Sequence, residues 1–270
     1  LIVSVRNDDG KDGFYWYSSE VGYEELLIEG DEILPGVSIR PSPNGLSVID
    51  GHLIFTRQAT VESVDSARAL FSLDLETGDI VEHARRGDVL ERTEVPVSSL
   101  GTSFATAGNN NTFMTMHHLE HDFLSGEGPI SALVEHRFDG SADTLVSPSD
   151  FSGDTQAGWI IQFDASEEGY AAFSRVEEVG GPLTTTVLYL VDPSGNVFEI
   201  AHSLNTFFDN APVDFDFFSF EFLALQDDGL SFTAYWQDPT DESFVGKATG
   251  SLSTIYPRWL QIFPRRGRWR

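Results

Sequence analysis

Three histidines in one short run are the residues with the most direct metal chemistry. His117, His118 and His121 lie beside two acidic residues, Glu120 and Asp122. Imidazole and carboxylate groups are good ligands for zinc and similar metals. In an extended segment His118 and His121 face opposite sides, so a shared metal requires a turn. The alternative interpretation is a solvated polar loop between two strands.

An acidic turn near the N-terminus is a second candidate metal site. Residues 7–13 read Asn-Asp-Asp-Gly-Lys-Asp-Gly, and Asp8, Asp9 and Asp12 supply the hard oxygen ligands that calcium prefers. Lys11 stands where a further oxygen ligand is expected, and the spacing is not that of an EF-hand loop. The alternative is an ordinary acidic turn between two strands. Calcium is the cofactor that this turn would bind.

Acidic residues are numerous enough to supply the two carboxylates of a glycoside hydrolase. The chain has 43 Asp plus Glu residues, and some five-bladed propellers cleave glycosides with carboxylates at the central channel. The strand positions that we expect to face such a channel carry small uncharged residues, which disfavours this chemistry: Ser4, Thr56, Thr115, Ser174 and Thr233. The sequence contains no nucleophile elbow, no His-Glu-x-x-His motif and no phosphate-binding glycine loop.

Aromatic residues are a further candidate binding feature, because rings at loop ends bind sugars and proteins. Packing between sheets also uses aromatic rings, and we favour that interpretation. The residues concerned are Tyr15, Trp16, Tyr17, Trp159, Tyr235 and Trp236.

The charge balance restricts the partners. The chain carries 43 acidic against 16 basic residues, and residues 1–257 hold only 11 of those bases. Such a surface repels phosphate backbones, so nucleic acid is not an expected partner. No apolar run reaches 18 residues, so we expect no membrane insertion. The absence of cysteine excludes disulfides and thiolate chemistry.

The elements that position these groups recur along the chain. Short β-patterned runs are centred on Phe55, Met114, Phe173 and Phe232, at intervals of 59 residues, and residues 1–5 look like a fifth copy. A second and a third strand follow each run, joined by polar turns at 76–79, 139–141, 192–196 and 249–250. A longer link leads to a fourth strand, as at residues 45–49, 159–163 and 218–225.

Four short strands per repeat are the blade unit of a propeller, and neighbouring blades must stack to bury their faces. We therefore predict an all-β fold: a β-propeller of about five four-stranded blades over residues 1–257, followed by a basic tail at 258–270. A larger ring is expected if the chain is a fragment. A β-sandwich is the structural alternative, but sandwiches do not need a fixed period.

The residues at the end of the first repeat resemble a motif of a known family. Residues 27–36 read Leu-Ile-Glu-Gly-Asp-Glu-Ile-Leu-Pro-Gly, and residues 83–88 match in part. The repeat resembles the uncharacterised tandem-repeat propellers of exported bacterial proteins, of the choice-of-anchor type. The resemblance implies an extracytoplasmic location, secreted or at the cell surface, and supplies no catalytic residues. The chain begins without Met inside an apolar run, so we interpret it as a mature or truncated fragment that lacks its export signal.

Three functions are compatible with these patterns. The first is a non-enzymatic extracellular propeller that acts as a binding or surface-scaffold module for a protein or glycan ligand. The alternative is a carbohydrate-active hydrolase that uses central-channel carboxylates, and the third is a calcium-stabilised structural propeller. A hydrolase differs in one observable, because it needs two carboxyl groups about 5 to 10 Å apart in a concave site.

Overall fold

The structure is a computed structural model, and its described part is built from strands apart from one short 3₁₀ helix, η2 (Pro148–Asp150). It describes residues 1–39, 44–61, 64–106, 111–120, 130–151, 158–178, 184–202, 216–226, 229–238 and 241–253. The predicted tail at 258–270 and His121 lie outside these ranges. The strands form five antiparallel sheets.

The first two sheets use the N-terminal third of the chain. The first contains β1 (Ile2–Arg6), β2 (Asp12–Ser18) and β3 (Gly22–Ile28). The second contains β4 (Glu32–Leu34), β5 (Val37–Ile39), β6 (Asn44–Ile49), β7 (His52–Val61), β8 (Val64–Asp74) and β9 (Ile80–Arg85). Both β5 and β6 pair with β7.

The remaining sheets follow in chain order. The third contains β10 (Val97–Thr106), β11 (Thr112–Leu119), β12 (Ser131–Arg137) and β13 (Ala142–Val146). The fourth contains β14 (Gly158–Ala165), β15 (Ala171–Glu178), β16 (Thr184–Val191) and β17 (Val197–His202). The fifth contains β18 (Asp216–Gln226), β19 (Gly229–Asp238) and β20 (Asp241–Ser253).

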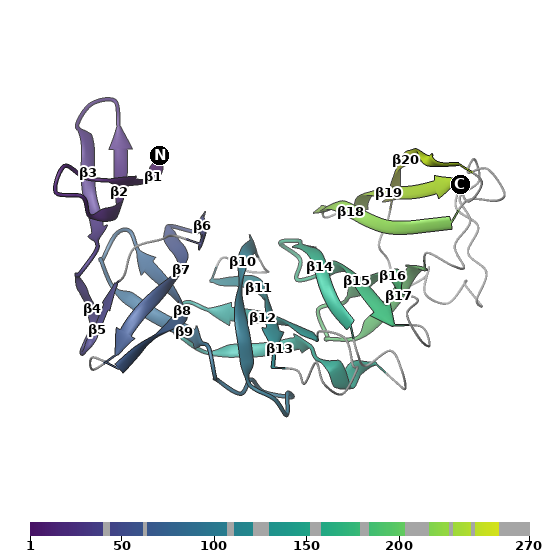
Figure 1. The fold of residues 1–270 in the computed structure, drawn as a ribbon, viewed down its shortest axis with the longest axis horizontal. Helices are drawn as coiled ribbons and strands as arrows, with labels where there is room; N and C mark the ends of the chain where they lie inside the picture. The colour runs from purple at the N-terminus through teal and green to yellow at the C-terminus, as the bar shows by residue number, and fades with distance from the viewer. Residues whose placement is uncertain are drawn as a thin grey trace.

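The five sheets follow one another around an arc, with the first and the fifth sheet at its two ends (Figure 1). The strands β6, β10, β14 and β18 contact one another in turn, as the innermost strands of propeller blades do. The all-β prediction of a propeller with about five blades is therefore confirmed. No described helix is long and apolar enough to cross a membrane.

The phase of the repeat differs from the prediction. The segments predicted as fourth strands are β6, β14 and β18, and each pairs with the strand that follows it. The reason is the tight link: Ile49 pairs with His52, and Asp50 (φ 48°) and Gly51 (φ 77°) form a two-residue hairpin turn between them. A hairpin this short forces its two strands to pair, so each blade begins with the predicted fourth strand.

The predicted turn at residues 249–250 is wrong. The strand β20 runs without a break from Asp241 to Ser253 along β19. Gly250 occupies an ordinary ladder position opposite Phe232. A glycine therefore marks a position within this long strand rather than its end.

Each pair of neighbouring sheets shares one hydrophobic cluster. The period-two alternation of a strand places Ile54 toward the third sheet and Phe55 toward the first, so both faces of β7 are buried. In the fourth sheet, Phe173 packs toward the third sheet and Ala172 toward the fifth. Burial of one such large apolar side chain contributes about 1.5–3 kcal/mol, so the stacking of sheets supplies most of the stabilisation.

The third sheet departs from the 59-residue spacing by one residue. Met114 packs toward the fourth sheet, whereas Phe113 packs toward the second, as the repeat positions Phe55 and Phe173 pack toward their preceding sheets. A slip of one residue moves every side chain of a strand to the other face. Phe113, and not Met114, is therefore the structural equivalent of the two phenylalanines.

A buried ion pair lies between the third and fourth sheets. Arg175 is 1% exposed and Glu177 is 3% exposed, and Arg175 Nη1 donates to Glu177 Oε1 at 2.6 Å. The same oxygen accepts from the Tyr189 hydroxyl at 2.6 Å, which raises the pKa of Tyr189 together with burial. The guanidinium carbon stands 3.8 Å from the ring centroid of Phe151. Gly158 leaves this space open, because a Cβ there would lie 2.7 Å from Arg175 Cζ.

We expect Glu177→Ala to lower the free energy of unfolding by about 3–5 kcal/mol, because it leaves a buried guanidinium without its carboxylate. The double variant Arg175→Met, Glu177→Leu should recover most of that loss, since both charges are then absent. Urea unfolding at pH 7 measures both effects. Glu168→Ala, at an exposed position of the β14–β15 turn, is the control and should change stability by less than about 0.5 kcal/mol. A loss of less than about 1 kcal/mol in Glu177→Ala would show that the ion pair is solvated.

Candidate functional site

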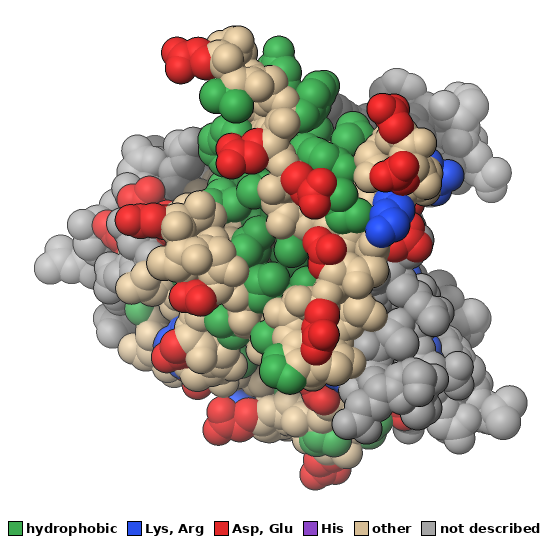
Figure 2. All heavy atoms as spheres, turned by 90° about the vertical axis from the view of Figure 1, so that its left-hand side faces the viewer, with side chains coloured by type: hydrophobic (Ala, Val, Ile, Leu, Met, Phe, Trp, Pro, Cys, Tyr) green, Lys and Arg blue, Asp and Glu red, His purple; other side chains and the backbone are tan. Residues whose placement is uncertain are grey.

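An acidic cleft lies where the first and second sheets meet. Its volume is about 580 Å³, and its walls come from the end of β3, the strand β4 with the turn before it, and the β8–β9 turn with the start of β9. The lining residues are Leu27, Asp31, Glu32, Ile33, Leu34, Gly78, Asp79 and Ile80. Figure 2 shows the side of the molecule that carries β3 and β4: hydrophobic side chains run through its middle and acidic side chains stand along them.

The turns hold each carboxylate of the cleft by one oxygen. The backbone N–H of Ile28 donates to Asp31 Oδ2 at 2.8 Å, and that of Gly36 donates to Glu32 Oε1 at 2.8 Å. The Asp79 Oδ2 atom accepts from the Thr77 hydroxyl at 2.9 Å. All three carboxylates are exposed to solvent. The cleft therefore presents three positioned carboxylates to anything that enters it.

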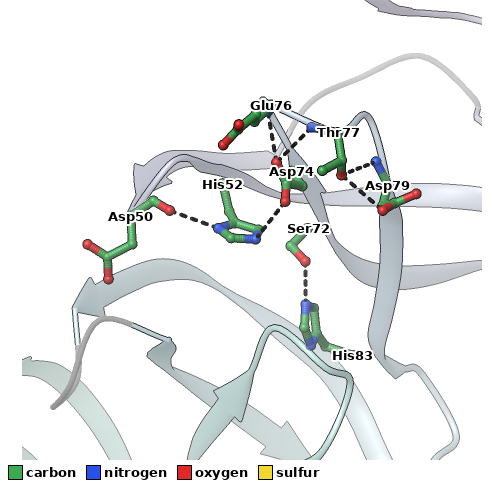
Figure 3. A network of polar contacts seen from close by, with 8 residues as sticks. All are labelled: Asp50, His52, Ser72, Asp74, Glu76, Thr77, Asp79 and His83. Atoms are coloured by element: carbon green, nitrogen blue, oxygen red, sulfur yellow. Dashed lines mark hydrogen bonds and ion pairs between the residues drawn. The ribbon is translucent and has the colours of Figure 1, made fainter.

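A polar network secures the β8–β9 turn behind Asp79 (Figure 3). The Asp74 Oδ1 atom accepts from the backbone N–H groups of Thr77 at 3.1 Å and Glu76 at 2.8 Å, and these bonds lower the pKa of Asp74. His52 Nε2 lies 3.7 Å from the other oxygen of Asp74. Thr77 thus links Asp74 to Asp79, and the turn places Asp79 at the cleft.

The structure does not bring His117 and His118, the two described histidines of the predicted run, together. His117 is fully buried on β11, where its Nε2 lies 3.1 Å from Nε2 of His136 on β12. The adjacent His118 lies 3.1 Å by its Nδ1 from the Ser131 hydroxyl. Neighbouring residues of a strand face opposite sides, so these two histidines do not share a ligand site. With His121 outside the described residues, metal binding by this run stays a prediction.

A different histidine cluster lies between the second and third sheets. The ring of His136 is 5.3 Å from that of His117 and 5.6 Å from that of His83, which comes from β9. Burial lowers the pKa of His83 to about 4 and that of His117 to about 3, and it lowers the pKa of His136 as well. The part of the chain that the structure describes gives no partner to any of the three Nδ1 atoms. Sequence spacing missed this cluster, because its members come from three strands and two sheets.

The acidic turn at residues 7–13 joins β1 and β2. Asn7 organises it, since Asn7 Oδ1 accepts from the backbone N–H of Lys11 at 2.9 Å. Arg6 Nε donates to Asp12 Oδ1 at 2.9 Å, and this bond lowers the pKa of Asp12. Asp8 and Asp9 are exposed. In the described ranges no three His, Cys, Asp or Glu residues are placed to hold a metal ion. Calcium binding by Asp8, Asp9 and Asp12 stays a prediction.

Three of the five small residues that we expected to face the channel are buried within sheets; of the other two, Ser4 is exposed on β1, and the side chain of Thr233 lies outside the described residues. Thr56, Thr115 and Ser174 are fully buried on the second strands of their sheets, so their small size says nothing about channel chemistry. Among described side chains of β6, β10 and β14, the one carboxylate is Asp164. Burial raises the pKa of Asp164, and its Oδ2 accepts from the backbone N–H of Leu225 at 2.7 Å, which links the fourth sheet to the fifth.

The predicted aromatic residues divide between packing and solvent. Trp16 and Tyr17 are about 40% exposed near the end of the β2–β3 hairpin, and Tyr17 pairs with the exposed Tyr23 at 5.0 Å between ring centroids. Trp159 on β14 is partly buried. The side chains of Tyr235 and Trp236 lie outside the described residues.

Comparison with known proteins gives structural matches alone. Neither a family model nor a curated protein sequence matches the chain. Trypanosoma rangeli sialidase matches 87% of this chain and 40% of its own, at 11% identity and a TM-score of 0.39. Penicillium chrysogenum α-L-arabinanase matches 90% of this chain and 79% of its own, at 9% identity and a TM-score of 0.39. Bombyx mori β-fructofuranosidase matches 83% of this chain and 49% of its own, at 12% identity and a TM-score of 0.35.

These matches correct one prediction. We predicted a non-enzymatic binding or surface-scaffold module, but the matched structures are mostly glycoside hydrolases. The comparison runs against that prediction. The chain covers less than half the length of the sialidase and the fructofuranosidase that it matches.

The histidine cluster predicts a loss of stability in acid. The folded pKa values of His83, His117 and His136 lie below the unfolded value of about 6.5, so the unfolded chain binds more protons as the pH falls through 6.5 toward 4. In this range each histidine lowers the free energy of unfolding by about 1.4 kcal/mol for each pH unit of acidification. We expect His136→Leu to flatten the fall in unfolding free energy between pH 6.5 and 4.5, measured by urea titration.

The matched control for this experiment is His202→Gln at the end of β17, which should keep the wild-type slope. An equal slope in wild type and His136→Leu would contradict the expectation. The difference between variants is the quantity to compare, because acid also reduces the −27 net charge and its self-repulsion.

Proposed function

We propose that the chain is a carbohydrate-active hydrolase that cleaves glycosidic bonds in the acidic cleft. The observation that supports this proposal is the presence of three positioned carboxylates, Asp31, Glu32 and Asp79, in one concave site. Glycoside hydrolysis requires a pair of carboxyl groups that flank the bond to be cleaved. The site lies between two sheets at their edge, rather than on the inner strands where we predicted it.

The two carboxylates of such a pair have different tasks. One protonates the leaving oxygen as a general acid, and the other attacks the sugar or activates water. The aliphatic side chains of Leu27, Ile33, Leu34 and Ile80 share the cleft with the carboxylates. A sugar that covers these side chains removes water from the site, and loss of water raises the pKa of a carboxyl group toward the range of a general acid.

The cellular setting stays a prediction. A glycan-cleaving role fits a secreted or surface-exposed protein, which is also what the resemblance to exported tandem-repeat propellers implies. We retain both as part of the proposal.

The proposal is tested by release of reducing sugar from a panel of neutral and acidic polysaccharides and nitrophenyl glycosides. Asp31→Asn, Glu32→Gln and Asp79→Asn each keep the volume of the side chain and one acceptor oxygen for its turn. We expect at least two of them to lower kcat by about 100-fold or more, because each removes a group that transfers a proton or attacks the sugar.

Two controls separate the cleft from other carboxylates. Glu76→Gln, in the same β8–β9 turn but not in the cleft lining, should keep full activity. Asp164→Asn, on the inner strand β14, should also keep kcat. Activity that survives all three cleft variants but fails in Asp164→Asn would move the chemistry to the inner strands. No cleavage of any substrate would refute the proposed function.

A further inference from the structure

Arg57 is a buried cation between the first and second sheets. It lies on β7 and is 2% exposed, on the strand face that Phe55 turns toward the first sheet. Its guanidinium carbon stands 4.3 Å from the ring centroid of Phe14 on β2. Among the described residues, no acceptor receives a hydrogen bond from its Nε or Nη1 atom. Buried side-chain donors in folded proteins rarely lack a hydrogen-bond acceptor.

The internal repeat shows what such an arginine pairs with. Arg175 stands two 59-residue periods after Arg57, also over a phenylalanine ring, and donates to the Glu177 carboxylate. Tyr189 pairs across the strands with Phe173 and donates to the same carboxylate. In the second sheet, Phe71 pairs across the strands with Phe55 and stands where Tyr189 does. The sequence has Ala59 at the position of Glu177. The second sheet thus keeps the arginine and replaces both the glutamate and the tyrosine.

The charges near Arg57 do not replace that carboxylate. Asp12 and Glu29 attract Arg57 electrostatically, but burial is the larger effect and lowers the pKa of Arg57. Both oxygens of Asp12 already accept hydrogen bonds from Arg6, at 2.9 and 3.3 Å. A buried charge without a hydrogen-bonded partner is strongly destabilising, and a carboxylate beside that charge offsets a large part of the cost.

We propose that Arg57 anchors a carboxylate-binding site between the first and second sheets, in which the ligand supplies the carboxylate that Glu177 supplies beside Arg175. The planar guanidinium matches a carboxylate through paired donors. The repeat itself pairs this arginine position with a carboxylate, and the acidic surface disfavours anions of higher charge. The ligand is a small organic acid or the acid group of a sugar. Its assignment to a sugar acid rests on the proposed function, while the site itself does not.

The test is a thermal melt of the full chain at one fixed ionic strength in sodium chloride, sodium acetate, sodium galacturonate or sodium sulfate, with galactose as the neutral sugar. We expect carboxylates to raise the Tm by about 5 °C at 100 times Kd, beyond the effect of chloride. An equal rise with acetate and galacturonate identifies a site for small acids. A rise that is larger with galacturonate, and absent with galactose, identifies an acidic sugar.

Two variants make the test specific to Arg57. Arg57→Met removes the charge but keeps the apolar stem, and Ala59→Glu restores the carboxylate of the repeat. Both should abolish the carboxylate effect, and Ala59→Glu should melt at a higher temperature than wild type without ligand. Arg86→Met, at an exposed position, should keep the effect.

The proposal is overturned if carboxylates act no more strongly than chloride, if sulfate acts as strongly as carboxylates, or if Arg57→Met keeps the response. These outcomes are independent of the hydrolysis assay. A catalytically silent protein that binds carboxylates through Arg57 would refute the proposed function and support the site.

Discussion

The second, third and fourth sheets carry hydrophobic side chains on both faces, and each buried face depends on the neighbouring sheet that covers it. The strand β7 shows the constraint at its simplest, with Phe55 packed toward the first sheet and Ile54 toward the third. A single sheet in water would expose one apolar row or the other. The order of the sheets, the arc that they follow and the position of the cleft all depend on this pairwise covering.

The same interfaces determine whether the polar groups buried in them are charged and paired or neutral. A charge placed between two sheets loses its water, so it must be paired or become neutral. Arg175 is paired with Glu177, whereas the three histidines between the second and third sheets become neutral. Arg57 has the burial of the first case without its carboxylate. The ligand that we propose for Arg57 would supply the carboxylate that the packing of the two sheets does not.

Much of the fold was predictable from the sequence, because alternation and glycine-containing turns are local signals. The phase of the blades was not, since pairing depends on which links are short, and the one-residue slip at Phe113 is visible only in how the sheets pack. The cleft escaped prediction because Asp31 and Asp79 are 48 residues apart in sequence and lie in two separate turns, one between the first and second sheets and one within the second. His117 was predicted as a metal ligand, but the histidine that it lies near, His136, belongs to another strand, as does His83 beside His136.

The hydrophobic clusters of the described residues join consecutive sheets in a single series. A mechanical load applied between the first and fifth sheets would therefore pass through every interface one after another. Among the described residues, no hydrophobic cluster joins the first sheet to the fifth, so the weakest interface in the series gives way first.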